Sequence, residues 1–269
     1  KAIRLCSKNS MPKSTPAELG ALGRDVDGTP NNGPINYESI IGMLLYLTSH
    51  SHPDCAFAAH QCACYTFEPK SSHVSALQHS GCYLKGTADM GLILDPTDTL
   101  DLDCYPDADF WGLWGHNDPQ DPHCIFSCTG YVITLAGCPV LWTSKLTALS
   151  MMKVEYIALS TACKDLFPLI NLVTELGTAL GMSISSSGNL HIWIHEDNVG
   201  ALTLSSLEPK RMTPRSKHYA IKYHWFREHV HSRRIHLLKI DSRNQLGDLF
   251  TKGLPASSFT HLRSLLMGW

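Results

Sequence analysis

The sequence predicts an α/β fold in which a mixed five-stranded sheet is flanked by helices and is preceded by a small helical segment. Three observations predict it: helical periodicity over residues 37–86, short strand-like runs between residues 100 and 143, and alternating helix and strand patterns from residue 149 onward. The resulting order, β-β-β-α-β-α-α-β-α, is typical of a sheet with helices packed on it. With 269 residues and 43% hydrophobic content, the chain can bury such a core.

The amino-terminal part lacks strand patterns. Residues 1–35 are rich in Pro, Gly, Ser and Asn with little periodicity, so we expect an extended lead-in there. Apolar residues at helical spacing then predict three helices, over 40–47, 53–65 and 73–86. We therefore expect residues 36–97 to form the helical segment.

The rest of the chain, residues 98–269, is expected to form one α/β domain. Turn residues bound strand patterns at 91–94, 100–105, 130–135 and 139–143. The elements expected after them are a helix over 149–180, a strand over 190–195, a short helix over 199–204, an amphipathic helix over 216–231, a strand over 234–240 and a final helix from Gln245.

Charge is sorted along the chain, although the net charge is only −2. Residues 95–125 contain eight acidic residues and no Lys or Arg, whereas residues 208–243 contain ten Lys or Arg and three acidic residues. An acidic pocket beside a basic track suits a metal nuclease, and two solvated surfaces would have the same composition. No run of about 18 apolar residues is evident, so we expect no membrane partner. The ten cysteines are expected to be mostly buried thiols.

Four carboxylates fall where such a fold can gather them. Asp107 follows the first main strand, Glu155 lies in the first turns of a helix, Asp197 ends a strand and Asp248 opens the expected last helix. Carboxylate oxygens are the ligands that Mg²⁺ prefers, and a pair of ions can promote in-line phosphodiester hydrolysis. Position alone does not separate these four from ordinary surface acids, because the chain has 24 acidic residues.

Seven motifs in a fixed order carry a resemblance that does separate them. They are YPDADF (105–110), SCTGY (127–131), LWTSK (141–145), ALS to EYIA (148–158), EDN (196–198), RSKH (215–218) and QLGDLFTK (245–252). Together they resemble the ribonuclease H segment of copia-type retrotransposon polyproteins. Several motifs in the correct order are far more specific than any one of them.

The amino-terminal third resembles the segment that trails the reverse-transcriptase palm in the same polyproteins. The matching stretches are 37–47, HPD (52–54), LKGT (84–87) and GL (91–92). The resemblance therefore covers about residues 14–269. Because the palm's Y-x-D-D box is absent, we expect no polymerase activity from this chain by itself.

The resemblance implies a ribonuclease H-like fold and metal-dependent cutting of the RNA strand of RNA–DNA hybrids during reverse transcription. It implies two Mg²⁺ or Mn²⁺ ions held by Asp107, Glu155, Asp197 and Asp248, with Asp109 as a nearby fifth acid. The implied partners are the hybrid and the remainder of the reverse-transcriptase polyprotein. The implied location is a cytoplasmic virus-like particle or the nucleus.

Basic residues before and at the start of the 216–231 helix are the candidates for gripping the hybrid. Cations and backbone N–H groups at a helix start can contact phosphate. A solvated basic helix start would have the same pattern. The candidates are Lys210, Arg211, Arg215, Lys217 and His218.

Two departures from the family pattern leave a second interpretation open. Lys153 stands where the family usually has an acid, two residues before Glu155, and the span between Lys145 and Ala148 is about three residues short. The alternative is a decayed, catalytically weak copy that acts only as a nucleic-acid-binding or structural module. An integrase of the same fold class is disfavoured by the order of the four acids and by the QLGDLFTK ending.

Overall fold

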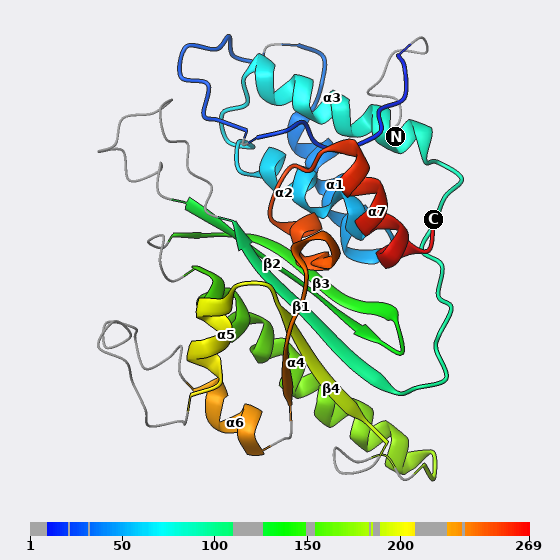
Figure 1. Ribbon diagram of the computed structural model, residues 1–269. Helices are drawn as coiled ribbons and strands as arrows, with labels where there is room; N and C mark the ends of the chain where they lie inside the picture. The colour runs from blue at the N-terminus through cyan, green and yellow to red at the C-terminus, as the bar shows by residue number, and fades with distance from the viewer. Residues whose placement is uncertain are drawn as a thin grey trace.

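A mixed five-stranded sheet lies between two groups of helices in the computed structural model of the chain (Figure 1). The structure describes residues 10–20, 22–31, 33–109, 126–148, 154–182, 184, 189–207, 225–232 and 235–269. Its strands are β1 (Asp101–Asp109), β2 (Phe126–Leu135), β3 (Cys138–Ala148), β4 (His191–Glu196) and β5 (His236–Lys239). The order across the sheet is β3-β2-β1-β4-β5. The predicted α/β class with a five-stranded mixed sheet is therefore confirmed.

Strand direction divides the sheet into two halves. The pairs β1–β2 and β2–β3 are antiparallel, whereas β4 pairs parallel with β1 and β5 pairs parallel with β4. Two residues, Ala136 and Gly137, connect β2 to β3 with φ angles of 51° and 79°. A two-residue turn with both φ angles positive matches the natural twist of a hairpin. The parallel pairs need long crossovers, which the helices supply.

One face of the sheet is covered by α4 (Val154–Ala179), α5 (Val199–Ser205) and α6 (Phe226–Ser232). Side chains alternate along a strand, so Leu102 and Cys104 of β1 lie on the same face as Ile192 and Ile194 of β4. All four are fully buried in a core that includes the apolar side of α4. The central pair of strands therefore rests on the longest helix.

By length and composition α4 could cross a membrane, whereas the sequence pattern led us to expect no such segment. Within its most apolar window, 56% of the residues are buried inside the protein. The core helix of a soluble protein passes the same test, so this finding is weak evidence for a membrane partner. The absence of such a partner stays a prediction.

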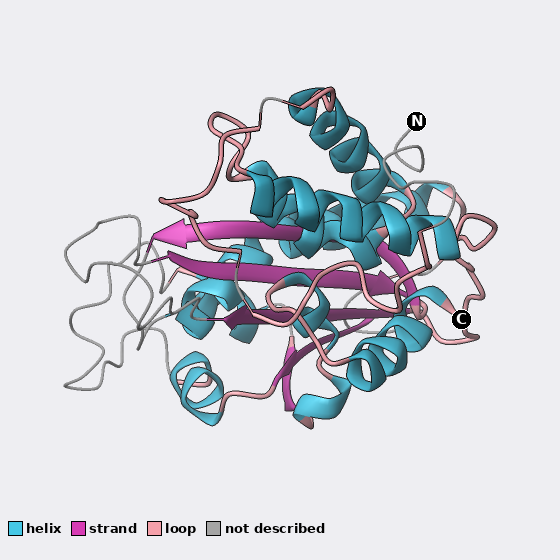
Figure 2. Cartoon of the chain, turned by 90° about the horizontal axis from the view of Figure 1, so that it is seen from above, coloured by secondary structure: helices cyan, strands magenta, loops and turns pink. Residues whose placement is uncertain are grey.

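The opposite face is covered by α1 (Tyr37–His50), α2 (Ala56–Ala63), α3 (Ser71–Gly86) and the carboxyl-terminal α7 (Ala256–Met267), with a short 3₁₀ helix, η2 (Pro53–Cys55), between α1 and α2 (Figures 1 and 2). These helices share one hydrophobic core with β2. The indole Nε1 of Trp142 donates to the carbonyl of Thr48 at 2.6 Å, and the amide of Leu146 donates to Nε2 of His60 at 3.1 Å. The helical segment is thus joined to the sheet by apolar and polar contacts.

The described part of residues 1–35, which begins at residue 10, contains no helix and packs along α2 and α3, while the expected extended lead-in stays a prediction. The Tyr65 hydroxyl donates to the carbonyl of Leu22 at 2.6 Å, and the Ser80 hydroxyl donates to the carbonyl of Pro16 at 2.8 Å. Side chains of the helical segment therefore satisfy these two backbone carbonyl groups.

Two expected boundaries are corrected, and a third element lies partly outside the described residues. Residues 91–94 form no strand: the amide of Ile93 donates to the carbonyl of Met267, and no strand among the described residues pairs with them. The final helix does not start at Gln245; two 3₁₀ turns, η6 (Ser242–Asn244) and η7 (Leu246–Phe250), come first, and α7 starts after Pro255. Of the expected 216–231 helix, the structure describes only the part from Trp225 onward, which contains α6.

Candidate active site

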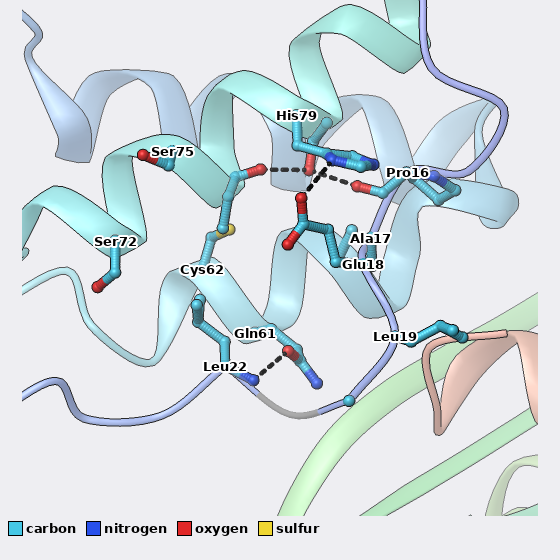
Figure 3. Close-up of a pocket in the computed structure, with 14 residues that line it drawn as sticks. Pro16, Ala17, Glu18, Leu19, Leu22, Gln61, Cys62, Ser72, Ser75 and His79 are labelled. Atoms are coloured by element: carbon cyan, nitrogen blue, oxygen red, sulfur yellow. Dashed lines mark hydrogen bonds and ion pairs between the residues drawn. The ribbon is translucent and has the colours of Figure 1, made fainter. Parts of the chain in front are cut away.

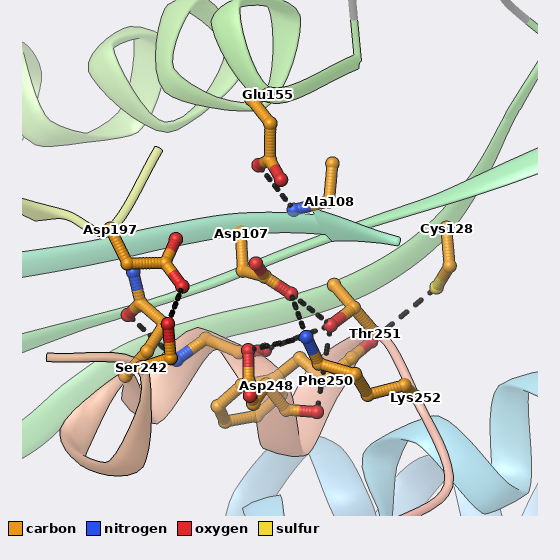
Figure 4. A network of polar contacts seen from close by, with 12 residues as sticks. Asp107, Ala108, Cys128, Glu155, Asp197, Ser242, Asp248, Phe250, Thr251 and Lys252 are labelled. Carbon is orange, nitrogen blue, oxygen red and sulfur yellow. Dashed lines mark hydrogen bonds and ion pairs between the residues drawn. The ribbon is translucent and has the colours of Figure 1, made fainter. Parts of the chain in front are cut away.

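The four predicted acids lie at one edge of the sheet (Figure 4). Asp107 lies near the end of β1, Asp197 directly follows β4, Glu155 lies in the first turn of α4 and Asp248 lies in η7. Because β1 and β4 run parallel, their carboxyl ends meet at the same edge. Four elements that are far apart in the sequence therefore deliver acids to the same edge of the sheet.

Two glycines allow η7 to lie directly on the sheet. A Cβ atom on Gly247 would be 2.6 Å from Cβ of Asp107 and 2.9 Å from the carbonyl oxygen of Tyr105. Gly130 is the register partner of Asp107 on β2, and a Cβ there would be 2.5 Å from Cβ of Phe250. Distances this short exclude any side chain at either position, so both glycines are required for Asp248 to approach Asp107.

The buried side chain of Gln245 joins η7 to the two central strands. Its Nε2 donates to the carbonyl of Pro106 at 3.1 Å and to the carbonyl of His195 at 3.2 Å. Its Oε1 accepts from the amide of Gly247 at 3.2 Å. One amide group therefore holds the ends of β1, β4 and η7 together beside the acids.

Two of the acids are oriented by neutral donors. Glu155 accepts a hydrogen bond from the amide of Ala108 at 3.0 Å, which fixes the start of α4 against β1. Asp197 accepts from the hydroxyl of Ser242 at 2.7 Å. In Figure 4 the Glu155 carboxylate lies on the opposite side of β1 from the Asp107 carboxylate.

The other two acids share a cation from the chain itself. The Lys252 ammonium lies 2.8 Å from Oδ1 of Asp248 and 3.7 Å from Oδ2 of Asp107 (Figure 4). The hydroxyl of Thr251 also donates to Asp107. Asp107 and Asp248 are therefore neighbours, with a Lys charge between them.

Burial and mutual repulsion dominate the electrostatics of this edge. The pKa of Glu155 is raised by burial and then by the neighbouring charges of Asp107 and Glu196. The pKa of Asp248 is likewise raised by burial and then by Asp107. Burial lowers the pKa of Lys252, but the two carboxylates outweigh it and the net shift is upward. The cluster carries more negative charge than its own Lys neutralises.

The donor set fits a hard divalent cation in its chemistry. Oδ1 of Asp248 and Oε2 of Glu196 are buried and lack a well-directed hydrogen bond within the described chain, although the Lys252 ammonium lies close to the former. Buried carboxylate oxygens of this kind are what Mg²⁺ or Mn²⁺ prefers. However, no three His, Cys, Asp or Glu side chains among the described residues form a ready coordination group. The acids are suitable metal ligands, but among the described residues they do not form a complete coordination shell.

Sequence reasoning assigned no role to Glu196 or Lys252. Glu196 is fully buried on the same face of β4 as Ile192 and Ile194. The sequence signal that could have found it is an acid that continues the alternating apolar series of that strand face. Lys252 follows Asp248 by four positions, which was the corresponding signal. Asp109 is the last residue of β1. Burial raises its pKa, and the Lys252 charge opposes that shift, so the Asp109 carboxyl lies within reach of the charges of Lys252 and Asp107.

The five candidate residues for gripping nucleic acid fall outside the described residues, so the structure does not place them. They are Lys210, Arg211, Arg215, Lys217 and His218. Lys153 also lies outside the described residues, whereas the span between Lys145 and Ala148 is described and forms the end of β3.

A cavity of about 280 Å³ lies away from the acids, between the lead-in and helices α2 and α3 (Figure 3). Leu22 and Gln61 line it, and so do His79 and Glu18, whose side chains form an ion pair at 3.2 Å. None of the four predicted acids lines this cavity. It offers no carboxylate cluster for the predicted chemistry.

Replacing Glu196 with Gln is expected to stabilise the metal-free protein, increasingly so as the pH rises. Burial raises the pKa of Glu196 from 4.5 to about 8. Because the pKa of this carboxyl is higher in the folded than in the unfolded protein, its contribution to stability is fully present below pH 4.5. That contribution is lost as the pH rises from 4.5 through about 8, where the buried group must ionise. Gln keeps the shape without the charge, so the variant escapes that loss.

Thermal unfolding in chelator at pH 5 and pH 8 measures this effect. The melting temperature of the Gln variant should exceed that of the wild type by several degrees more at pH 8 than at pH 5. An equal difference at both pH values would contradict a raised pKa for Glu196.

The chain is similar to polyproteins of plant transposons. It is 31% identical over 256 residues to the retrovirus-related Pol polyprotein from transposon RE1 of Arabidopsis thaliana, and 32% identical over 251 residues to the one from transposon RE2 of the same plant. It is 29% identical over 273 residues to the retrovirus-related Pol polyprotein from transposon TNT 1-94 of Nicotiana tabacum. These matches cover 94%, 92% and 98% of the chain, but only 16%, 16% and 19% of the respective polyproteins. No protein-family profile matches the chain, and no solved structure does.

Proposed function

The chain is a segment of the kind found in retrovirus-related Pol polyproteins of copia-type retrotransposons, and from this premise we propose that it acts as their ribonuclease H. In this proposal it hydrolyses the RNA strand of RNA–DNA hybrids during reverse transcription. The observation that carries the proposal is the gathering of Asp107, Glu155, Asp197 and Asp248 at one edge of a mixed sheet. Phosphodiester hydrolysis by a pair of divalent metal ions needs several acids in one place to hold the ions.

The proposed cofactor is a pair of Mg²⁺ or Mn²⁺ ions, held by the same four acids. Bound there, such ions would supply an activated water and charge stabilisation for the in-line displacement. The chain's own part is positioning. Gln245 and Gly247 hold η7 against β1, and the amide of Ala108 aims Glu155.

The proposed partners are an RNA–DNA hybrid and the remainder of the polyprotein, within a cytoplasmic virus-like particle or the nucleus. The basic stretch over residues 210–218 would contact the phosphates. Its candidate residues are Lys210, Arg211, Arg215, Lys217 and His218. Phosphate contacts fix the position of a nucleic acid without reading its sequence. The hybrid would be distinguished by its groove shape and its 2′-hydroxyl groups.

A second candidate function is nucleic-acid binding without cleavage. It is favoured by the ion pairs of Lys252 with two of the acids and by the cation Lys153 close to Glu155 in the sequence. The Lys252 ammonium brings positive charge to two of the acids that would hold metal ions, and Lys153 is a cation two positions before a third in the sequence. The grip on phosphate would be unaffected, because it uses a different part of the chain.

A hybrid-cleavage assay tests the proposal and separates it from the alternative. The chain is mixed with an end-labelled RNA annealed to DNA, in Mg²⁺, in Mn²⁺ and in chelator, and binding is measured on the same hybrid. We expect cleavage of the RNA in the hybrid, none in chelator, and none of single-stranded RNA or duplex DNA. Tight binding without cleavage at any metal concentration would leave the binding module as the function.

A further inference from the structure

Lys252 occupies the position of a cation between two of the proposed metal ligands. We propose that it is a built-in counter-ion, which holds Asp107 and Asp248 together in the metal-free protein and which a divalent ion must displace. The inference rests on the proposed function, because it concerns the same acids. It assigns Lys252 a positioning role that sets how much metal the site requires.

The chain holds the Lys252 side chain at the site by its backbone. The amide of Lys252 donates to the carbonyl of Asp248 at 3.3 Å, which continues the turn of η7. The neighbouring hydroxyl of Thr251 donates to Asp107. The ammonium group therefore reaches both carboxylates from a fixed point, one at 2.8 Å and the other at 3.7 Å.

The charges favour a cation at this point. The Asp107 side chain is only 3% exposed and that of Asp248 only 11%, so water screens their repulsion poorly. The Lys252 ammonium supplies one positive charge, whereas a divalent ion would supply two. Mg²⁺ needs oxygen ligands at about 2.0–2.1 Å, which leaves no room for an ammonium group between the same oxygens. The two cations must therefore compete.

The contact also has the features of a displaceable one. The Lys252 side chain is 33% exposed, which gives its ammonium group a route into solvent. Its contact with Oδ1 of Asp248 at 2.8 Å is as short as a charge-assisted hydrogen bond, but its distance of 3.7 Å from Asp107 is beyond hydrogen-bond length. The ammonium group is therefore held firmly by one carboxylate only.

Manganese binding by the full chain tests the proposal without relying on activity. The variants are Lys252→Met, which removes the charge, and Lys252→Arg, which keeps it. Lys164→Met on the exposed side of α4 is the matched control, because it makes the same change in net charge. Free Mn²⁺ is measured by electron paramagnetic resonance during titration.

We expect Lys252→Met to bind Mn²⁺ about tenfold more tightly than the wild type, which is the order of one ion pair's contribution. Lys252→Arg should bind within about twofold of the wild type because it keeps the positive charge between the two carboxylates. Lys164→Met should also bind within about twofold, because the charge that it removes is exposed and largely screened. Unchanged or weaker binding by Lys252→Met would overturn the proposal, and so would absence of binding in both it and the wild type.

A measurement on the unmodified chain covers the case in which Lys252→Met does not fold. Displacement should expose the ammonium group, so acetic anhydride should label Lys252 severalfold faster in Mn²⁺ than in chelator. Labelling of Lys164 should not change. Equal labelling of Lys252 in both conditions would overturn the proposal, whereas failure of the ribonuclease proposal would show separately, as absence of hybrid cleavage by the wild type.

Discussion

Replacing Asp107 with Asn is expected to reduce hybrid cleavage by more than about a hundredfold, because it removes a charge proposed to hold the metal ions and loss of one electrostatic catalytic group typically costs about 10²–10³ in rate. Asp107 is the acid that faces Asp248, Thr251 and Lys252 at the edge of the sheet. Asn keeps the shape and still accepts a hydrogen bond from Thr251, but it removes the charge that would bind a cation. Affinity for the hybrid should change little, because phosphate contacts are separate from the chemistry.

The measurement is cleavage and binding of one hybrid by the wild type and the variant. Asp101→Asn is the matched control: it makes the same change at the far end of β1, where the Asp101 carboxylate accepts from the Thr99 hydroxyl. The control should cleave within about twofold of the wild type, as surface substitutions away from a site usually have small effects. If Asp107→Asn loses binding and cleavage equally, its role is in folding.

A fragment of residues 98–269 is expected not to fold by itself, although the sequence suggested it as a domain. Its sheet and carboxyl-terminal helix share one hydrophobic core with helices α1, α2 and α3. Removing those helices exposes six side chains that are now buried. They are Val132, Leu249, Phe250, Phe259, Leu262 and Leu266.

The size of the effect follows from the area that would be exposed. Each large apolar side chain contributes about 1.5–3 kcal/mol when buried, and a whole domain is stable by only about 5–15 kcal/mol. Exposing six such side chains therefore costs about as much free energy as the whole folded state has in excess over the unfolded state. The hydrogen bonds from Trp142 to Thr48 and from Leu146 to His60 would be lost as well.

Circular dichroism and urea unfolding of the fragment and of the full chain measure this effect. We expect no cooperative transition for the fragment and binding of a hydrophobic dye. Leu77→Ala in the full chain removes one fully buried side chain of α3 and should cost about 2–5 kcal/mol while leaving a cooperative transition. A fragment that unfolds cooperatively near the midpoint of the full chain would show that the helical segment is dispensable.

Local patterns predicted most elements because the responsible interactions are local. The period of apolar residues predicted α1, α3, β1, β2 and β4 to within a few residues. It failed at residues 91–94 and at Gln245, where the outcome depends on distant partners. Residues 91–94 pair with no strand among the described residues. The segment after Gln245 forms 3₁₀ turns because the Gln245 side chain is hydrogen-bonded to the ends of β1 and β4.

The sequence by itself predicted the class of fold, which the structure confirms, and a resemblance to copia-type polyproteins, with which the similarity to transposon Pol polyproteins agrees, because motif order and hydrophobic period are written along the chain. It also named the four acids, whose role stays a prediction. Only the tertiary structure showed that η7 approaches β1 through Gly247, that Glu196 is buried beside the acids and that Lys252 lies between Asp107 and Asp248. The physical reason is that charge and steric effects act over a few ångströms in space. Asp107 and Lys252 are 145 positions apart in the sequence, and the fold alone brings them within 3.7 Å.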